Sequence, residues 1–302
     1  DARAQPTATN QPSCRKSVFM TAGNKIHGLG VASPALKTIV LCADDFGMAP
    51  GIDAGILALA RTQRLSAVSC MSRGRHFRSD VPELAGLPID RGLHLDLTEL
   101  RPGAESGAFY QPLRRLIWHC WSRTIAPGII TLEIERQLDA FEDALGAAPD
   151  YVDGHQHVHQ FPVIRDCLVE VLRRRYTGSL PWLRSTLPRD CPGVSLPDRL
   201  KASVIGHLGG ESLKALAGRH GLAMNARLLG VYGFAGGQEA YSALLDSWLA
   251  SAAGSDLLMC HPAKFADPAD PLAGQRVAEY ALLSGERLPA LLARHGVVIG
   301  RL

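Results

Sequence analysis

The chain has 302 residues, of which 46% are hydrophobic and 20% charged, a composition typical of a globular protein rather than a disordered chain. Its net charge of +3, without a basic cluster, gives no electrostatic basis for binding nucleic acid. The seven cysteines form no CxxC pair, and no apolar run reaches the roughly 18 residues of a membrane span. We therefore expect a reduced, cytoplasmic protein without a disulfide framework, a thiolate zinc site or a membrane span.

Residues 1–36 differ from the rest of the chain. They mix Pro, Thr, Asn, Gly and Ser without an apolar period, and their longest apolar piece, residues 18–20, is too short for a secretory signal. We expect a disordered or atypical N-terminal extension there. Residues 37–302 then form a single domain, whose length suits a (β/α) barrel of about 250 residues.

From residue 37 onward, short apolar runs typical of buried parallel strands alternate with helical patterns. Ile52, Ile56 and Leu59, for example, recur at the spacing of one face of an amphipathic helix. This alternation favours an α/β protein built as a (β/α) barrel, complete or distorted, with long loops at the carboxyl face of the strands. The expected strands are 38–43, 67–71, 92–97, 151–153, 182–184, 228–231, 257–260 and 297–299.

Two stretches, 100–128 and 186–227, are longer than a crossover connection requires. Long loops on a barrel often act as functional lids. The first stretch carries four aromatic residues, which either stack against a sugar or pack the loop onto the barrel. They are Phe109, Tyr110, Trp118 and Trp121.

The first expected strand runs into Asp44 and Asp45. Two adjacent carboxylates directly after an apolar strand are costly unless they are paired or bound to a metal. Neighbouring side chains of an extended segment point in opposite directions, so one carboxylate can bind a cation while the other holds a water or a proton. The alternative is that one of them caps a helix that begins near Pro50.

Histidines mark the third and fourth expected strands. In the third, His94 alternates with leucines and would share a face of the strand with Asp96. A lone histidine in a strand is more often a core residue than a ligand, so His94 by itself favours the core role. The fourth strand leads into the segment DGHQHVH, residues 153–159, in which every second residue is an aspartate or a histidine. An extended segment would place all four side chains on one side. Imidazole is the commonest metal ligand near neutral pH, so we expect a metal to contact one or two of them.

Two further polar residues follow later strands. His261, fixed by the following Pro262, is a candidate acid or base after the seventh strand. Arg184 ends the fifth strand and either orients a carboxylate or has a surface or salt-bridge role. The carboxyl ends of barrel strands carry the active site, so these residues are expected to converge with the aspartates and histidines of the earlier strands. Two imidazoles and one carboxylate form an open metal site that suits metal-assisted hydrolysis.

Four segments resemble the motifs of the YdjC-like carbohydrate deacetylases, a family that includes chitooligosaccharide deacetylases and hopanoid-biosynthesis deacetylases. They read ADDFG at 43–47, GLHLDLT at 92–98, DGHQHVH at 153–159 and CHPA at 260–263. The resemblance covers about residues 37–302 and occurs in the family's order. It implies a barrel-like fold, a divalent metal, and hydrolysis of the N-acetyl group of an acetamido sugar.

The resemblance also implies roles for individual residues. Asp45, His94 and His155 match the metal ligands, Asp44 matches the general base, and His261 matches the general acid. The metal expected from the family is Mg²⁺, with Zn²⁺ second because two imidazoles favour softer cations.

We expect Asp44 to take a proton from the attacking water and His261 to protonate the departing amine. In this scheme Arg184 keeps Asp44 ionised, and a backbone N–H of Phe46 or Gly47 helps to stabilise the oxyanion. The alternatives are a metal-dependent hydrolase for another amide or a phosphoester, and a non-catalytic carbohydrate-binding protein. The sequence leaves the oligomeric state open, a homodimer included.

Overall fold

The computed structural model describes residues 36–99 and 109–302, and all eight expected strands are present in it. Their ends differ from the predicted ends by at most three residues. The prediction for the N-terminal extension concerns residues that, apart from Leu36, lie outside the described ranges. The strands are β1 (Lys37–Phe46), β2 (Ala67–Cys70), β3 (Asp90–Leu95), β4 (Tyr151–Gly154), β5 (Trp182–Leu183), β6 (Leu228–Leu229), β7 (Leu257–Cys260) and β8 (Val297–Ile299).

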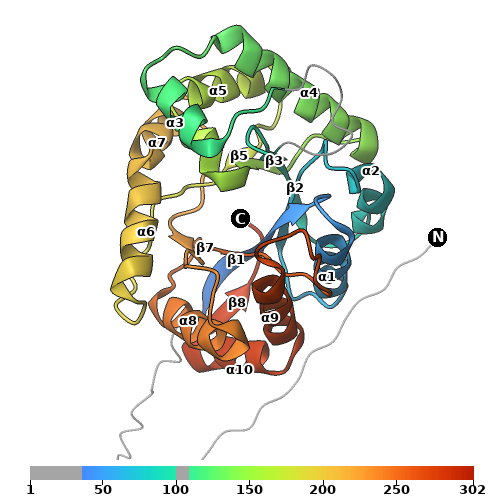
Figure 1. Cartoon of the computed structure of the whole chain (residues 1–302), viewed down its shortest axis with the longest axis vertical. Helices are drawn as coiled ribbons and strands as arrows, with labels where there is room; N and C mark the ends of the chain where they lie inside the picture. The colour runs from blue at the N-terminus through green and yellow to red at the C-terminus, as the bar shows by residue number, and fades with distance from the viewer. Residues whose placement is uncertain (1–35, 100–108) are drawn as a thin grey trace, which may run out of the picture. The chain divides into compact units, whose positions relative to one another are not determined.

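The strands form one curled parallel sheet in the order β5-β4-β3-β2-β1-β7-β6, with β8 paired to β1 outside this path. The long strand β1 pairs with β8 at its beginning and with β7 and β2 further along. Only isolated bridges, Leu183 to Met224 and Pro188 to Leu228, occur on the side between β5 and β6. The predicted α/β barrel is therefore confirmed in its distorted form, a curled half-barrel (Figure 1).

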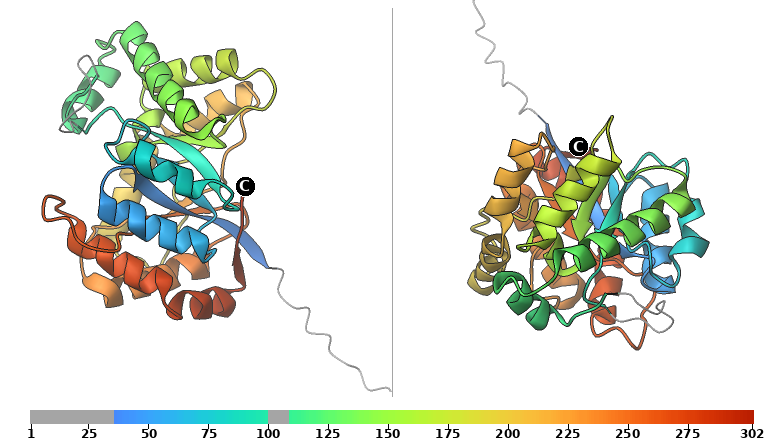
Figure 2. Two further views of the ribbon diagram at one scale, coloured as in Figure 1. Left: turned by 90° about the vertical axis from the view of Figure 1, so that its right-hand side faces the viewer. Right: turned by 90° about the horizontal axis from the view of Figure 1, so that it is seen from above.

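Helices surround the sheet, as both the face view and the side views show (Figures 1 and 2). Most of them connect successive strands as crossovers, which is why the strands run parallel. The helices are α1 (Pro50–Arg61), α2 (Phe77–Asp80), α3 (Leu113–Trp121), α4 (Pro127–Leu145), α5 (Ile164–Arg175), α6 (Leu196–His207), α7 (Gly210–Arg219), α8 (Gly237–Ser251), α9 (Ala273–Ser284) and α10 (Arg287–His295), with 3₁₀ turns η1 (Val81–Leu84) and η2 (His155–Gln160).

Alternation along β1 divides the core into two parts. Ile39, Leu41 and Ala43 join the larger apolar cluster that includes the helices' buried faces. Val40 and Cys42 join a smaller cluster made of residues from several strands of the sheet. Because side chains of a strand alternate between faces, the next residue on the side of Val40 and Cys42 is Asp44.

The two long stretches are less loop-like than predicted. Within the described part of 100–128 the chain forms α3, and within 186–227 it forms α6 and α7. The start of α6 carries an ordinary signal, since Ser195 caps it by accepting a hydrogen bond from the backbone N–H of Asp198, with a proline in the first turn. Proline and glycine flanking these helices favoured a loop prediction, although the helices themselves follow standard capping rules.

The six cysteines between 36 and 302 that are described are free and buried. No helix in the described ranges combines the length and apolarity needed to cross a bilayer.

Candidate active site

The end of β1 brings two carboxylates into one cavity of about 1180 Å³. Asp44 and Asp45 are 2% and 1% exposed, and both line this cavity. The prediction that they point in opposite directions is wrong. The strand register shifts between Ala43 and Phe46, and Asp45 adopts a left-handed backbone with φ of 73°, so the simple alternation of an extended strand ends here.

The helix-capping alternative for the aspartates is also wrong. Helix α1 follows Ala49 and has no side-chain cap. Instead, Asp53 of its first turn accepts a hydrogen bond of 2.6 Å from the backbone N–H of Gly47. This N–H is already used, which removes Gly47 as an oxyanion donor.

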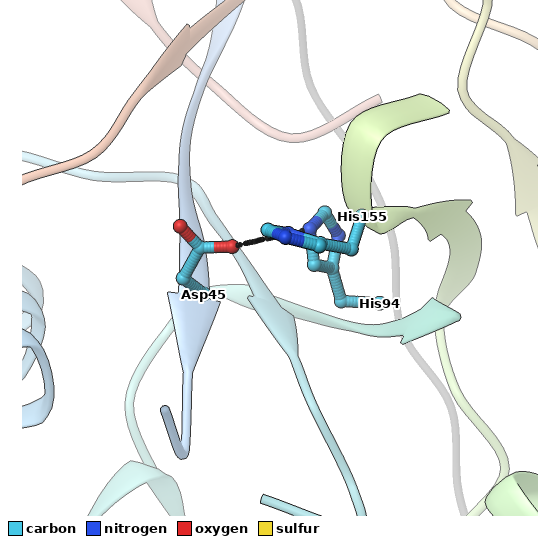
Figure 3. Close-up of side chains that lie close together, drawn as sticks. All are labelled: Asp45, His94 and His155. Carbon is cyan, nitrogen blue, oxygen red and sulfur yellow. Dashed lines mark hydrogen bonds and ion pairs between the residues drawn. The ribbon is translucent and has the colours of Figure 1, made fainter. Parts of the chain in front are cut away.

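Asp45, His94 and His155 bring three ligand atoms together, and their side chains converge in Figure 3. The Oδ1 atom of Asp45 lies 3.0 Å from Nδ1 of His155 and 3.4 Å from Nε2 of His94. Ligand atoms about 2.1 Å from a divalent cation, at angles of about 90–110°, lie roughly 3.0–3.4 Å apart. The chemistry and the spacing of these donors therefore fit a divalent metal.

The orientation of both imidazoles is fixed on their far side. Nδ1 of His94 is hydrogen-bonded to Oδ1 of Asp153 at 2.6 Å, which leaves Nε2 facing Asp45. Nε2 of His155 lies 3.4 Å from Oε1 of Glu99. A carboxylate behind a metal-binding histidine fixes its tautomer and raises its basicity.

The site concentrates negative charge around the imidazoles. Burial lowers the pKa of His94, but Asp153, Asp45 and Asp44 outweigh burial and raise it to about 10. Burial likewise lowers the pKa of His155, and Asp45 is the main group that raises it to about 9. A position that stabilises two imidazolium ions so strongly also favours a cation in place of the protons.

Arg184 is a buried residue, not a surface one, with 0% exposure. Its two terminal nitrogens each lie 2.6 Å from an oxygen of Asp44, and Nη2 lies 2.6 Å from Oδ2 of Asp153. Burial raises the pKa of the Asp44 carboxyl, but the Arg184 guanidinium outweighs burial and holds it well below the ordinary range. Arg184 thus orients a carboxylate, as one of the two sequence alternatives had it.

A second group with metal-ligand character, Cys42, Asp44 and Asp153, lies beside the first. Nη2 of Arg184 is 3.0 Å from Sγ of Cys42 and also contacts both aspartates. Burial raises the pKa of the Cys42 thiol to about 12, so the sulfur stays protonated. The guanidinium already supplies the positive charge here, which excludes this group as a metal site.

His261 lies opposite Arg184 across Asp44, with its Nε2 atom 3.8 Å from Oδ2 of Asp44. Its backbone N–H donates to Glu279 at 2.6 Å, and its ring packs edge-on against Phe234 with centroids 4.9 Å apart. Burial lowers the pKa of this imidazole to about 4, so it is neutral at neutral pH. His261 is therefore within reach of a proton that Asp44 has accepted.

The chain does not continue as an extended segment after Asp153. It turns at Gly154 into η2, where Gln156 and His157 take φ values of 51° and 61°. A Cβ at Gly154 would lie 2.9 Å from the backbone nitrogen of His159, so the turn requires glycine. The prediction of four side chains on one side of this segment is wrong for that reason.

The turn separates the three histidines. Only His155 reaches Asp45; His159 is hydrogen-bonded through Nε2 to the backbone oxygen of Arg184 at 3.0 Å. His157 lines the cavity, and its buried Nδ1 has no hydrogen-bond partner among the described residues. Burial lowers the pKa of His157 to about 3 and that of His159 to about 4.

Sequence reasoning missed Arg276 of α9. Its Nη2 atom lies 2.7 Å from Oδ2 of Asp45, the oxygen that faces away from His155. Burial raises the pKa of the Asp45 carboxyl, but Arg276 and then His155 outweigh it and hold the pKa well below its usual range. Arg276 lies on the buried face of an amphipathic helix, alongside Gln275 and Glu279. Charged residues are rarely buried without a partner, so this position could have marked Arg276 as a candidate site residue.

The aromatic residues of the long stretch do not form the cavity wall. Trp118 is 61% exposed, and neither it nor the other three aromatics lines the cavity. Trp121 packs edge-on against Phe161, which does line it. The wall contributed by α3 consists of Leu113 and Ile117.

A family model for the YdjC-like proteins matches residues 38–294. The chain belongs to the YdjC-like family. The matched segment includes β1 through α10 almost completely, and every predicted site residue, with Arg276, falls inside it.

Two curated relatives resemble the chain along most of its length. A carbohydrate deacetylase of Mus musculus is 28% identical and covers 88% of this chain and 94% of its own. A chitooligosaccharide deacetylase of Yersinia pestis (strain Pestoides F) is 26% identical and covers 87% of this chain and 97% of its own. Both relatives thus carry the name of a deacetylase, one of carbohydrates and one of chitooligosaccharides.

A solved structure shares the fold. A protein of Enterococcus faecalis V583, described as a candidate cellobiose-phosphate cleavage protein, superposes with a TM-score of 0.63 at 17% identity. It covers 88% of this chain and 98% of its own. At this identity the likeness concerns the fold.

Proposed function

We propose that this protein is a metal-dependent carbohydrate N-deacetylase, which hydrolyses the N-acetyl group of an acetamido sugar to acetate and a free amino sugar. The convergence of Asp45, His94 and His155 at one point of the cavity carries the proposal. The carbohydrate deacetylases among its relatives support the substrate class. A cavity of about 1180 Å³ has room for more than one sugar ring.

Asp45, His94 and His155 would hold the metal in this proposal. A divalent cation bound there supplies Lewis acidity toward the acetamide carbonyl and lowers the pKa of a bound water. Mg²⁺ is the first candidate by family, and Zn²⁺ is the second because two imidazole ligands favour it. Metal analysis of protein purified without added salts distinguishes the two.

Asp44 is the proposed general base. Its carboxylate is held by Arg184 through two contacts of 2.6 Å, so it stays ionised and fixed in direction. It takes a proton as water attacks the carbonyl carbon. His261 is neutral before the reaction and lies 3.8 Å from Asp44, so it takes up the proton that Asp44 removed from water and delivers that proton to the nitrogen as the C–N bond breaks.

Acetate release tests the reaction. Acetamido sugars, including N-acetylglucosamine oligomers and lipid-linked ones, are incubated with the protein with and without chelator. We expect acetate release that the chelator abolishes and that added metal restores. Phosphate release from generic esters instead would favour a phosphoesterase, and sugar binding without acetate release would favour a non-catalytic binding protein.

The metal content of site variants tests the assignment of the three metal ligands. Asp45→Ala, His94→Ala and His155→Ala should each lower the bound metal per chain and reduce turnover by at least the roughly 10²–10⁴-fold expected for losing a general acid or base. His207→Ala is the control, because His207 is exposed and bonds only within its own helix. Full metal content and turnover in the three site variants would disprove the assignment.

A further inference from the structure

Arg276 contacts the carboxylate of Asp45 from the side opposite the imidazoles. Oδ1 of Asp45 faces His155 and His94, whereas Oδ2 lies 2.7 Å from Nη2 of Arg276. The arginine is 2% exposed and comes from α9, far along the chain from β1. The two oxygens of one carboxylate therefore face different partners.

A second carboxylate holds Arg276 in turn. Nε of Arg276 lies 2.7 Å from Oδ2 of Asp270, which lines the cavity as Arg276 does. Asp270 belongs to the segment before α9, and its other oxygen accepts a hydrogen bond from the backbone N–H of Leu272 at 2.8 Å. The guanidinium group thus lies in ion pairs with two buried or nearly buried carboxylates, which define its position near Asp45.

The geometry of Asp45 needs such support. A free aspartate rotates about its terminal torsion, and either oxygen or both can then face a cation. Asp45 also has a left-handed backbone, with φ of 73°, which is strained for a residue other than glycine. A group that binds Oδ2 removes the rotational freedom and leaves Oδ1 as the single oxygen directed to His94 and His155.

We propose that Arg276 is a positioning residue for the metal centre: it binds Oδ2 of Asp45 so that Oδ1 alone serves as ligand, and Asp270 aligns it. The inference rests on the metal site of the proposed function. It adds that this site needs a residue of α9, Arg276, to bind metal with full affinity. Arg276 touches neither the metal nor the substrate in this role.

Replacement of Arg276 can change the metal affinity in either direction, and the direction shows whether charge or positioning dominates. A guanidinium near a cation repels it, so removal of its charge would tighten metal binding if electrostatics alone mattered. If positioning dominates, loss of the contact weakens metal binding, by about 10–100-fold as is typical for groups that orient metal ligands. Arg276→Gln removes the charge and keeps an amide that can still donate a hydrogen bond, and Arg276→Lys keeps the charge and loses the planar fork.

The affinity of metal-stripped protein for Zn²⁺ and Mg²⁺ is measured by titration calorimetry, without any substrate. We expect both Arg276→Gln and Arg276→Lys to bind metal about 10–100-fold more weakly than the native protein. Asp270→Asn, which leaves the contact with Asp45 in place, should show a smaller loss. Raised metal concentration should restore most of the turnover of Arg276→Lys, because no reacting group is removed.

Arg189 provides the matched control. It forms a similar two-contact pair with the buried Asp256, with distances of 2.7 and 2.9 Å, and does not line the cavity. Arg189→Lys should lower thermal stability as Arg276→Lys does and leave the metal affinity unchanged. A general structural effect would move both variants alike.

The outcomes separate this inference from the proposed function. Unchanged or tighter metal binding in both Arg276 variants would overturn the positioning role, and so would a native protein that binds no divalent metal. Weakened metal binding in a protein that releases no acetate from any acetamido sugar would support the positioning role and refute the deacetylase proposal.

Discussion

Positive φ angles occur at Asp45, Gln156 and His157, around the candidate metal centre. Each such residue other than glycine costs of the order of 1–2 kcal/mol, so neighbouring contacts must hold it. Asp45 is held by Arg276 and by His155, and it reaches the cavity only because of this conformation. Strain of this kind is common where a side chain must be directed to a reacting centre.

Asp44→Asn tests the general base at the residue scale. The substitution removes the proton acceptor and should lower kcat by about 10²–10⁴-fold. Metal affinity should stay within a few-fold of native, because the oxygens of Asp44 contact Arg184 rather than the metal-ligand group. Steady-state kinetics and calorimetric metal titration check both halves. A variant with native kcat would contradict the role of Asp44, and one that no longer binds metal would make it a ligand.

The helices that flank the His155 segment, α4 and α5, are joined by ion pairs. Helix α4 precedes β4, η2 follows it, and α5 comes next, so α4 and α5 flank the segment that carries Asp153 and His155. Arg175 of α5 contacts Glu142 of α4 at 3.0 and 2.6 Å and Asp139 at 2.6 Å. The two-contact geometry makes this pair stronger than an ordinary exposed ion pair.

The α4–α5 pair should make stability depend on pH. Burial raises the pKa of Glu142, but hydrogen bonds from Arg175 and Tyr176 outweigh it and lower the pKa overall. A lowered pKa in the folded state adds stability above the unfolded value of about 4.3, and this stability is lost as the pH falls through the folded pKa. Arg175→Ala should therefore lower the free energy of unfolding by about 0.5–1 kcal/mol at pH 7 and by less near pH 3.

Urea unfolding at both pH values measures the effect. Arg174→Ala, which removes the more exposed contact with Glu135, is the control and should change stability less. An equal loss at both pH values for Arg175→Ala would mean that packing of the arginine stem, rather than its charge, links the helices.

At the scale of the whole molecule, the candidate site is a product of the parallel sheet. Asp44 and Asp45 end β1, His94 lies in β3, His155 follows β4, and His261 follows β7. Parallel strands place all their carboxyl ends at one edge, and curling of the sheet brings strands that are not neighbours close together. A metal bound there would join β1, β3 and η2, so metal binding should be linked to global stability.

Added metal should raise the thermal midpoint of the whole protein. A ligand at about 100 times its dissociation constant stabilises the folded state by about 2.7 kcal/mol, which corresponds to roughly 5–10 °C for a domain of this size. Calorimetric scans of chelator-treated protein with Mg²⁺ or Zn²⁺ measure the shift and identify the preferred ion. Asp45→Ala should abolish the shift, and a shift that persists in it would place the metal elsewhere.

Local sequence was enough to predict the eight strands and to select the candidate site residues. Buried parallel strands are short apolar runs, and eight of them were visible as such. The residues Asp44, Asp45, His94 and His261 could be chosen because polar side chains at the ends of such strands are costly unless they have a function or a partner.

The way in which these side chains meet depends on contacts between distant segments. The turn at Gly154 that selects His155, the backbone of Asp45, and the burial of Arg184 between two aspartates all depend on packing against distant segments. Arg276 was missed because its partner lies 231 residues away and no local pattern records that contact. Local sequence specifies periodicity and side-chain chemistry, whereas left-handed backbone angles and contacts between remote residues follow from the way the helices and strands pack.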